Sequence, residues 1–96
     1  MNTTPNLEID PRIEGFSIQK KASTNIEFFG SSYATGQMFF QFRNGTTYIY
    51  NGVPVDVMRS SVSCDSIGKF FHAMIKGRFE SEGIGERLVR EEVERG

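Results

Sequence analysis

Two tyrosines separated by one residue, Tyr48 and Tyr50, are the first residues of this sequence that suggest ligand binding. They follow Asn44-Gly45, a strong sequence signal for a hairpin turn. Alternate residues of a strand lie on the same face of a sheet, so the two rings are expected to point the same way. Exposed tyrosine rings can stack on a nucleotide base, and Arg43 beside them can neutralise a phosphate. The alternative is that both rings are packed structural residues.

The loop length of this hairpin decides between these two roles. With a two-residue turn at Asn44-Gly45, Gln41 faces Tyr48, and both tyrosines share a face with Arg43. With a three-residue loop over residues 43–45, the pairing slips by one position, and the tyrosines join Phe40 on the face towards the helices. The sequence leaves both registers open.

A row of basic side chains is the second candidate for binding. Apolar residues recur with helical period from Ile67 to Ile75, and the other face of this expected helix carries Lys69, His72 and Lys76, with Arg78 just beyond. Phosphate groups are the natural ligands of such a row. The alternative is a solvated helix face, because spaced lysines occur on many protein surfaces.

Catalytic and metal-binding chemistry has little support in the sequence. His72 is the only histidine and Cys64 is the only cysteine, and no pattern near them marks an oxyanion hole. One histidine and one cysteine fall short of the three or four ligands of a typical zinc site. We therefore expect a protein that is not an enzyme and that carries no metal or cofactor.

Short strands and two helices must position the candidate residues. Residues 25–29, 37–42 and 46–50 have the composition of strands, and turn signals between them predict a three-stranded antiparallel meander. Pro54 suits the first turn of a short helix that ends near residue 61, and a second helix follows from about residue 67 to 77. The expected fold class is α+β, with both helices packed on one face of the sheet.

The two ends of the chain differ in composition from its centre. Residues 1–19 contain two of the three prolines and no sustained period, which predicts an extended or disordered arm, part of which could dock as an edge strand. Residues 80–96 contain acidic and basic residues four apart, which predicts a charged helical tail. The domain proper is expected over residues 20–79.

The net charge of −1 hides an uneven distribution of charge along the chain. Residues 20–79 contain seven basic and three acidic residues, whereas residues 80–96 contain six acidic and three basic residues. The near-neutral total therefore arises from a basic domain between acidic ends, which is compatible with an anionic ligand.

Composition also bears on location and assembly. No apolar run approaches the length that spans a bilayer, and residues 1–10 lack the features of a signal peptide. We expect a cytoplasmic protein that does not bind membranes. A core of about 60 residues is marginally stable on its own, which motivates the hypothesis of a homo-oligomer.

An ordered set of residues resembles the KTSC domain, a family named for its occurrence at the carboxyl terminus of some lysyl-tRNA synthetases. The resemblance covers about 57 residues, from Ser23 to Phe79, and its central feature is Tyr48-Ile-Tyr50 after Asn44-Gly45 and before Val53-Pro54. The matching positions are Ser23-Thr-Asn-Ile26, Gly30, Thr35-Gly36, Phe40, Phe42, Ser66, Gly68 and Phe70-Phe71. Family members also stand alone in bacterial and phage proteins. The resemblance implies no established activity, although RNA binding has been proposed for the family.

Together these observations favour a non-enzymatic binding module for RNA, single-stranded DNA or a nucleotide-like anionic ligand. Its expected ligand-binding residues are Arg43, Tyr48, Tyr50, Lys69, His72, Lys76 and Arg78. The alternative is a small phage-type module that binds a host protein and inhibits a host enzyme or defence factor, with the acidic tail or the exposed face of the sheet as its contact.

Overall fold

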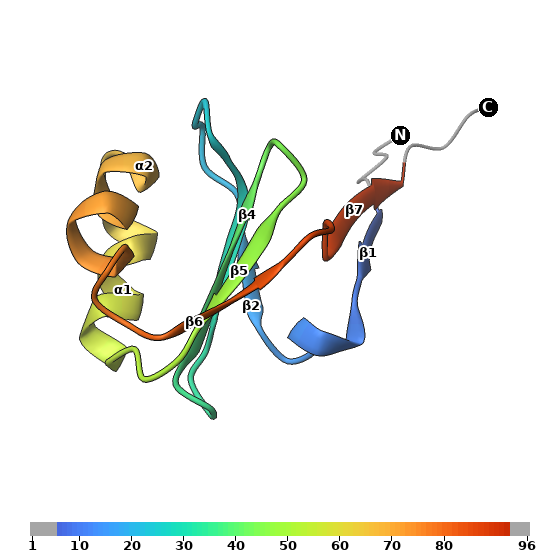
Figure 1. Ribbon diagram of the computed structural model, residues 1–96. Helices are drawn as coiled ribbons and strands as arrows, with labels where there is room; N and C mark the ends of the chain where they lie inside the picture. Colours follow the sequence, from blue (N-terminus) through green and yellow to red (C-terminus); the bar gives the residue numbers. More distant parts are fainter. Residues whose placement is uncertain (1–5, 93–96) are drawn as a thin grey trace.

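The computed structural model describes residues 6–92, which form two antiparallel sheets with helices on one side (Figure 1). The larger sheet has the strand order β2-β3-β4-β5-β6. Its strands are β2 (Ser17–Gln19), β3 (Ile26–Ser32), β4 (Gln37–Phe42), β5 (Thr47–Tyr50) and β6 (Ser81–Ile84). The smaller sheet pairs β1 (Asn6–Ile9) with β7 (Val89–Glu92). The predicted α+β class is confirmed, but the three expected strands are the centre of a five-stranded sheet.

Two helical segments cover one face of the larger sheet, in agreement with the sequence-based prediction. The first is α1 (Val55–Ser63), which Pro54 precedes in an extended conformation suited to a helix start. The second begins with α2 (Ile67–Phe70), which the Ser66 side chain caps, and continues as a π-helical turn, η2 (Phe71–Ile75). Within the described residues, no helix is long and apolar enough to cross a membrane.

The hairpin between β4 and β5 has the three-residue loop. Phe40 pairs with Tyr48 and Met38 with Tyr50, and the Phe42 N–H donates to the Thr46 carbonyl over 2.8 Å. Gly45 takes a φ of +95°, which a glycine adopts without strain. The tyrosines therefore lie on the face towards the helices, and the register that would place them on the opposite face is wrong for this hairpin.

Both faces of the larger sheet are packed, so the face opposite the helices is not the exposed contact surface that the alternative hypothesis expected. The first core lies between the sheet and the helices, and its buried residues include Phe29, Phe40, Met58, Ile67 and Phe71. The second core lies on the opposite face, and it combines Phe28, Phe39 and Ile49 of the sheet with Ile13, Leu88 and Val89. The ends of the chain supply the second core.

The carboxyl-terminal segment forms strands rather than the predicted helix. β6 pairs with β5 along the edge of the larger sheet, and β7 begins at Val89. Favourable Glu–Arg spacing is worth only a few tenths of a kcal/mol per pair, whereas Leu88 and Val89 are each 1% exposed. Burial and strand pairing therefore outweigh the helical charge pattern. Residues 93–96, part of the predicted tail, lie outside the described residues.

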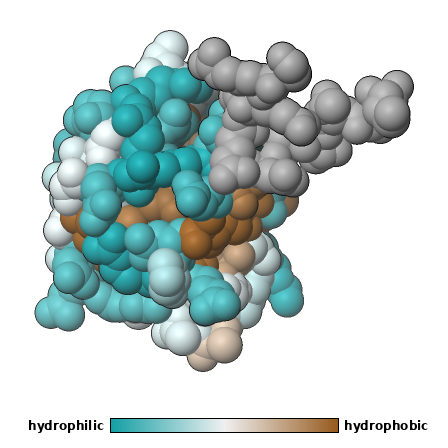
Figure 2. Space-filling model, turned by 90° about the vertical axis from the view of Figure 1, so that its right-hand side faces the viewer, coloured by the Kyte–Doolittle hydropathy of each residue, from teal (hydrophilic) through white to brown (hydrophobic). Residues whose placement is uncertain are grey.

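Most of the predicted amino-terminal arm is also structured. Residues 1–5 lie outside the described residues, but β1, the 3₁₀ turn η1 (Pro11–Ile13) and β2 follow in order. β2 is an edge strand that pairs with β3, as the sequence left open. On the side of the molecule that carries β1 and β7, apolar surface interrupts a largely hydrophilic face (Figure 2). There Leu7 and Ile9 of β1 remain about two-fifths exposed.

Candidate ligand-binding pocket

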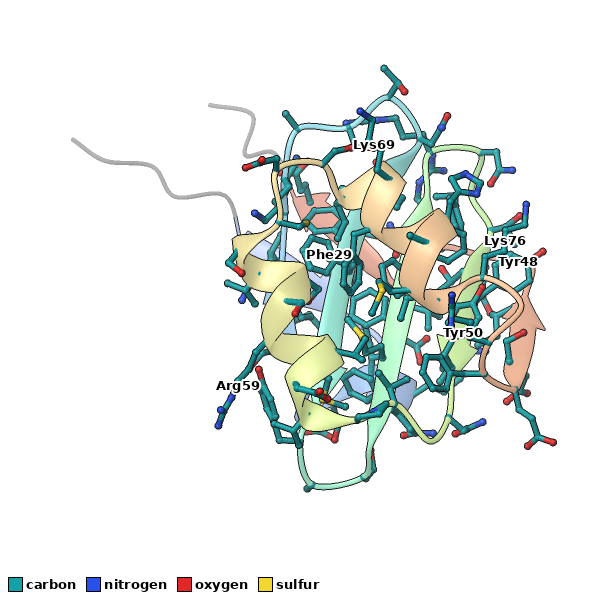
Figure 3. All side chains as sticks on the ribbon, turned by 90° about the vertical axis from the view of Figure 1, so that its left-hand side faces the viewer. Phe29, Tyr48, Tyr50, Arg59, Lys69 and Lys76 are labelled. Carbon is teal, nitrogen blue, oxygen red and sulfur yellow. The ribbon has the colours of Figure 1, made fainter. Side chains whose placement is uncertain are left out.

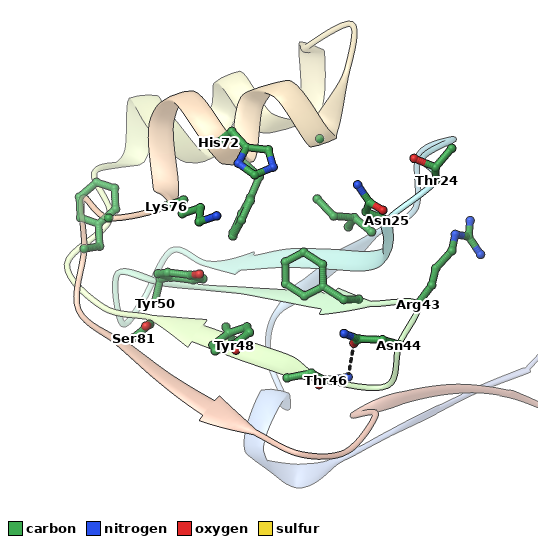
Figure 4. Close-up of a pocket in the computed structure, with 16 residues that line it drawn as sticks. Thr24, Asn25, Arg43, Asn44, Thr46, Tyr48, Tyr50, His72, Lys76 and Ser81 are labelled. Atoms are coloured by element: carbon green, nitrogen blue, oxygen red, sulfur yellow. Dashed lines mark hydrogen bonds between the residues drawn. The ribbon is translucent and has the colours of Figure 1, made fainter.

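A pocket of about 610 Å³ lies between the larger sheet and the α2–η2 segment (Figure 4). Phe42, Tyr48 and Tyr50 of the sheet contribute to one side of it, and Phe71, His72 and Lys76 contribute to the other. Its further lining residues are Thr24, Asn25, Ile26, Arg43, Asn44, Thr46, Gly68, Gly77, Phe79 and Ser81. This volume is in the range of small-molecule sites in proteins.

The aromatic side of the pocket is a continuation of the core. Phe71 is buried, and its ring centroid lies 5.2 Å from that of Phe42 and 5.9 Å from that of Tyr50. Tyr50 is 5% exposed, whereas Tyr48 is 37% exposed. The two tyrosines therefore differ in environment. Tyr50 is a core residue, whereas part of the Tyr48 ring is exposed in the pocket.

Tyr48 rests across a glycine of the neighbouring strand. Gly83 of β6 pairs with Tyr48, and a Cβ atom at Gly83 would lie 3.1 Å from Tyr48 Cε1. The Phe42 ring meets Tyr48 edge-on, with centroids 6.0 Å apart. The missing side chain at Gly83 and the edge of Phe42 thus fix the orientation of the exposed ring.

Burial makes the Tyr50 hydroxyl a weaker acid than a free tyrosine. Removal from water raises the pKa of Tyr50, and the neighbouring Tyr48 raises it further. Tyr50 is therefore neutral at physiological pH and brings no negative charge to the pocket.

The helical side of the pocket brings basic groups over the aromatic side. His72 and Lys76 are exposed and line the pocket, and the π-helical turn that joins them closes where the Lys76 N–H donates to the Phe71 carbonyl over 2.9 Å. π-Helical turns occur often at functional sites.

Two residues of the predicted basic row do not line this pocket. Lys69 is exposed on α2 and lies apart from Lys76, Tyr48 and Tyr50 (Figure 3). The Arg78 Nε–H donates to the Ala73 carbonyl over 2.7 Å, so this side chain provides a hydrogen-bond partner for a carbonyl in the last turn of the helix. The structure thus brings together Arg43, Tyr48, Tyr50, His72 and Lys76, five of the seven predicted site residues.

Polar residues that the sequence analysis did not assign to ligand binding complete the pocket at the end near Arg43. The Arg43 Nε–H donates to the Ser23 carbonyl over 2.9 Å, and the Arg43 N–H donates to the Asn25 carbonyl over 2.8 Å. Asn44 accepts from the Thr46 N–H, which leaves its amide NH₂ for other partners. The signal for Asn25 was faint, because an asparagine in a polar loop is ordinary in composition.

The pocket has a uniform electrostatic character. Its described lining residues include an arginine, a lysine and a histidine but no aspartate or glutamate. No ion pair within the described residues involves Arg43 or Lys76. The pocket therefore combines an aromatic surface with cations that form no ion pair within the described residues, an arrangement that suits a planar ring carrying negative charge.

Comparison with known proteins places this pocket in a recognised domain. Residues 22–79 match the family model of the KTSC domain. A protein of Tsukamurella paurometabola is 31% identical over 67 residues, which cover 70% of this chain and 100% of that protein. The crystal structure of a KTSC domain protein from Yersinia pestis is similar, with a TM-score of 0.68 and 34% sequence identity. The match covers 73% of this chain and 99% of the Yersinia pestis chain. Ser81 and Gly83 lie beyond the matched region.

Proposed function

The chain belongs to the KTSC domain family, and we propose that it is a non-enzymatic module whose pocket binds a nucleotide or a nucleotide unit of single-stranded nucleic acid. The observation that carries this proposal is that an exposed tyrosine ring and cations without an ion pair line one pocket, in which none of the described lining residues is acidic. Stacking on an aromatic ring contributes about 1–3 kcal/mol per base, and the basic groups supply the attraction for phosphate.

The chemistry of the pocket supports binding rather than catalysis. His72 is the one histidine of the pocket lining, and within the described residues no hydrogen bond joins it to a serine, threonine or cysteine. Cys64 is half-buried, and its thiol donates to the Ser61 carbonyl, away from the pocket. A site without a nucleophile and base in contact is suited to hold a ligand unchanged.

Replacing Tyr48 with leucine is expected to weaken nucleotide binding about tenfold or more, because the flat stacking surface is lost while the apolar volume is retained. Calorimetric titration of AMP and UMP and of short single-stranded RNA and DNA, each at low and moderate salt, measures the effect. Tyr33→Leu is the matched control, because Tyr33 is 49% exposed and does not line the pocket.

Absence of binding to every one of these ligands at low salt would overturn the proposal and favour a module that binds a host protein. That hypothesis cannot be tested by deleting residues 80–96, because β6 completes the sheet and Leu88 and Val89 fill the second core. Surface substitutions that keep the fold intact are the appropriate tool.

Replacing Gly83 with alanine is expected to weaken binding about three- to tenfold without unfolding the protein. The new Cβ would press on Tyr48 Cε1 and move the ring by a few tenths of an ångström, while the charge of the pocket stays the same. NMR chemical shifts of the Tyr48 ring, recorded with the titration, measure the displacement. Gly85→Ala is the control, since no atom lies within 4 Å of its Cβ position. An unchanged Tyr48 ring with unchanged affinity would show that Gly83 does not position it.

A further inference from the structure

We infer that the ligand of this pocket is a nucleotide with a phosphate group on each side of its sugar, one held by Lys76 and the other by Arg43. This inference rests on the proposed function and specifies the ligand class further. Nucleoside 3′,5′-bisphosphates and internal nucleotides of a single strand share this chemistry. A nucleoside 5′-monophosphate has only half of it.

The two cations stand at opposite ends of the pocket. In Figure 4, Lys76 lies above Tyr50, whereas Arg43 extends from the far end, beyond Asn44 and Thr46. The backbone between these ends runs from Thr46 to Tyr50, and four residues with a rise of about 3.3 Å each span about 13 Å. Hydrogen bonds to phosphate require about 3 Å between heavy atoms, so a pocket of this length offers room for a separate phosphate group at each end.

The exposed tyrosine lies between the two cations. Tyr48 is the middle residue of the Thr46–Tyr50 stretch, and its ring is 37% exposed. A base stacked there places its sugar near the centre of the pocket, with the 3′ and 5′ oxygens directed towards opposite ends. The order cation, aromatic ring, cation therefore matches the order phosphate, nucleoside, phosphate.

Each end has donors to spare for an anion. At one end the Arg43 guanidinium uses Nε for the Ser23 carbonyl and keeps its terminal nitrogens, and the Asn44 amide lies on the same hairpin loop. At the other end Lys76 has three N–H donors and lies with Ser81 in the lining. None of the described lining residues is an aspartate or a glutamate.

Calorimetric titration of the full chain with adenosine 5′-monophosphate, 3′-monophosphate and 3′,5′-bisphosphate tests this inference. We expect the bisphosphate to bind at least tenfold tighter than either monophosphate. Lys76→Gln and Arg43→Gln are each expected to reduce bisphosphate affinity about tenfold, and each is expected to affect only one of the two monophosphates. Lys69→Gln is the control, because Lys69 is an exposed lysine on the same helical segment outside the pocket.

The outcomes separate this inference from the proposed function. If the monophosphates and the bisphosphate bind equally well, or if both variants affect the same monophosphate, the two-phosphate assignment is overturned while nucleotide binding stands. If none of them binds at low salt, the proposed function itself fails. If trinucleotides of RNA or DNA bind tighter than the bisphosphate, the ligand is an internal nucleotide of a single strand. If the trinucleotides bind more weakly, the ligand is a free nucleoside bisphosphate.

Discussion

Replacing Gln41 with leucine is expected to lower the free energy of unfolding by roughly 3 to 5 kcal/mol. Gln41 is completely buried, and its amide oxygen accepts from the Leu88 and Val89 N–H groups over 2.9 and 2.8 Å. Its NH₂ group donates to the Val89 carbonyl and to Glu27. Leucine would leave three backbone groups buried without partners, at about 1–3 kcal/mol each. The total is a large part of the 5–15 kcal/mol that holds a typical domain together.

Chemical denaturation of the variant and of the wild type measures this loss. Gln37→Leu is the matched control: Gln37 lies on the same strand, but its side chain bonds Thr35 and Asn51 in exposed positions, so its loss is expected to cost less than about 1 kcal/mol. Equal losses for both variants would show that the segment around Leu88 is not held by Gln41. Hydrogen exchange at Leu88 and Val89 gives the same comparison locally, with faster exchange expected only in the Gln41 variant.

The Gln41 amide also acts on a neighbouring acid. Burial raises the pKa of Glu27, but hydrogen bonds from Gln41 and Arg87 outweigh this effect and place the pKa below its ordinary value. A carboxyl group with a lowered pKa stabilises the fold above its unfolded pKa and ceases to do so as the pH falls through the folded value. Glu27 therefore joins Gln41 and Arg87 in a contact that favours the folded state at neutral pH.

The centre of the fold could be predicted from local signals. The helical period from Ile67 to Ile75 and the proline at residue 54 predicted both helices. The turn residues predicted the three central strands. The ends could not, because their structure depends on contacts between residues far apart in the sequence. Gln41 looks like a solvent-facing strand residue, and nothing local shows that it binds residues 88 and 89.

The candidate site was predictable in its residue types but not in its position. The sequence offered an open sheet face or a buried one for the tyrosines. In the structure both tyrosines lie on the face that the helices cover, but the helices leave part of this face open at Tyr48. Arg43 lines the same pocket from the three-residue loop of the hairpin, and Lys69 does not line it. Such details depend on how far the helices extend over the sheet, which periodicity does not encode.

An aromatic ring over a glycine of the neighbouring strand occurs on both faces of the larger sheet. Tyr48 covers Gly83 on the helical side, and Phe39 covers its partner Gly30 on the opposite side. A ring in that place shields the glycine backbone and takes up the space of the missing side chain. The same arrangement thus positions the pocket-lining Tyr48 on one face and the core residue Phe39 on the other.

Replacing Gly30 with alanine is expected to destabilise the protein by about 3 kcal/mol and to displace β2 from the sheet. The new Cβ would lie 2.7 Å from Phe39 Cε1 and still closer to the Ser17 carbonyl oxygen. A side chain such as Phe39 can rotate away, but the Ser17 oxygen is backbone and moves only with its strand. Overpacking of this kind typically costs 1–3 kcal/mol, and here lost bonds between β2 and β3 add to it.

Denaturation measures the loss of stability, and hydrogen exchange across β2 and β3 locates it. Gly85→Ala is the control, because Gly85 has open space around its Cβ position and no positive φ, so the change is expected to alter stability by less than about 0.5 kcal/mol. Gly30→Ala with wild-type stability and protected β2 amides would contradict the prediction. Because β2 is the edge strand furthest from β6 and contributes no residue to the pocket lining, nucleotide binding by the remaining folded fraction is expected to persist, which separates the structural glycine at residue 30 from the positioning glycine at residue 83.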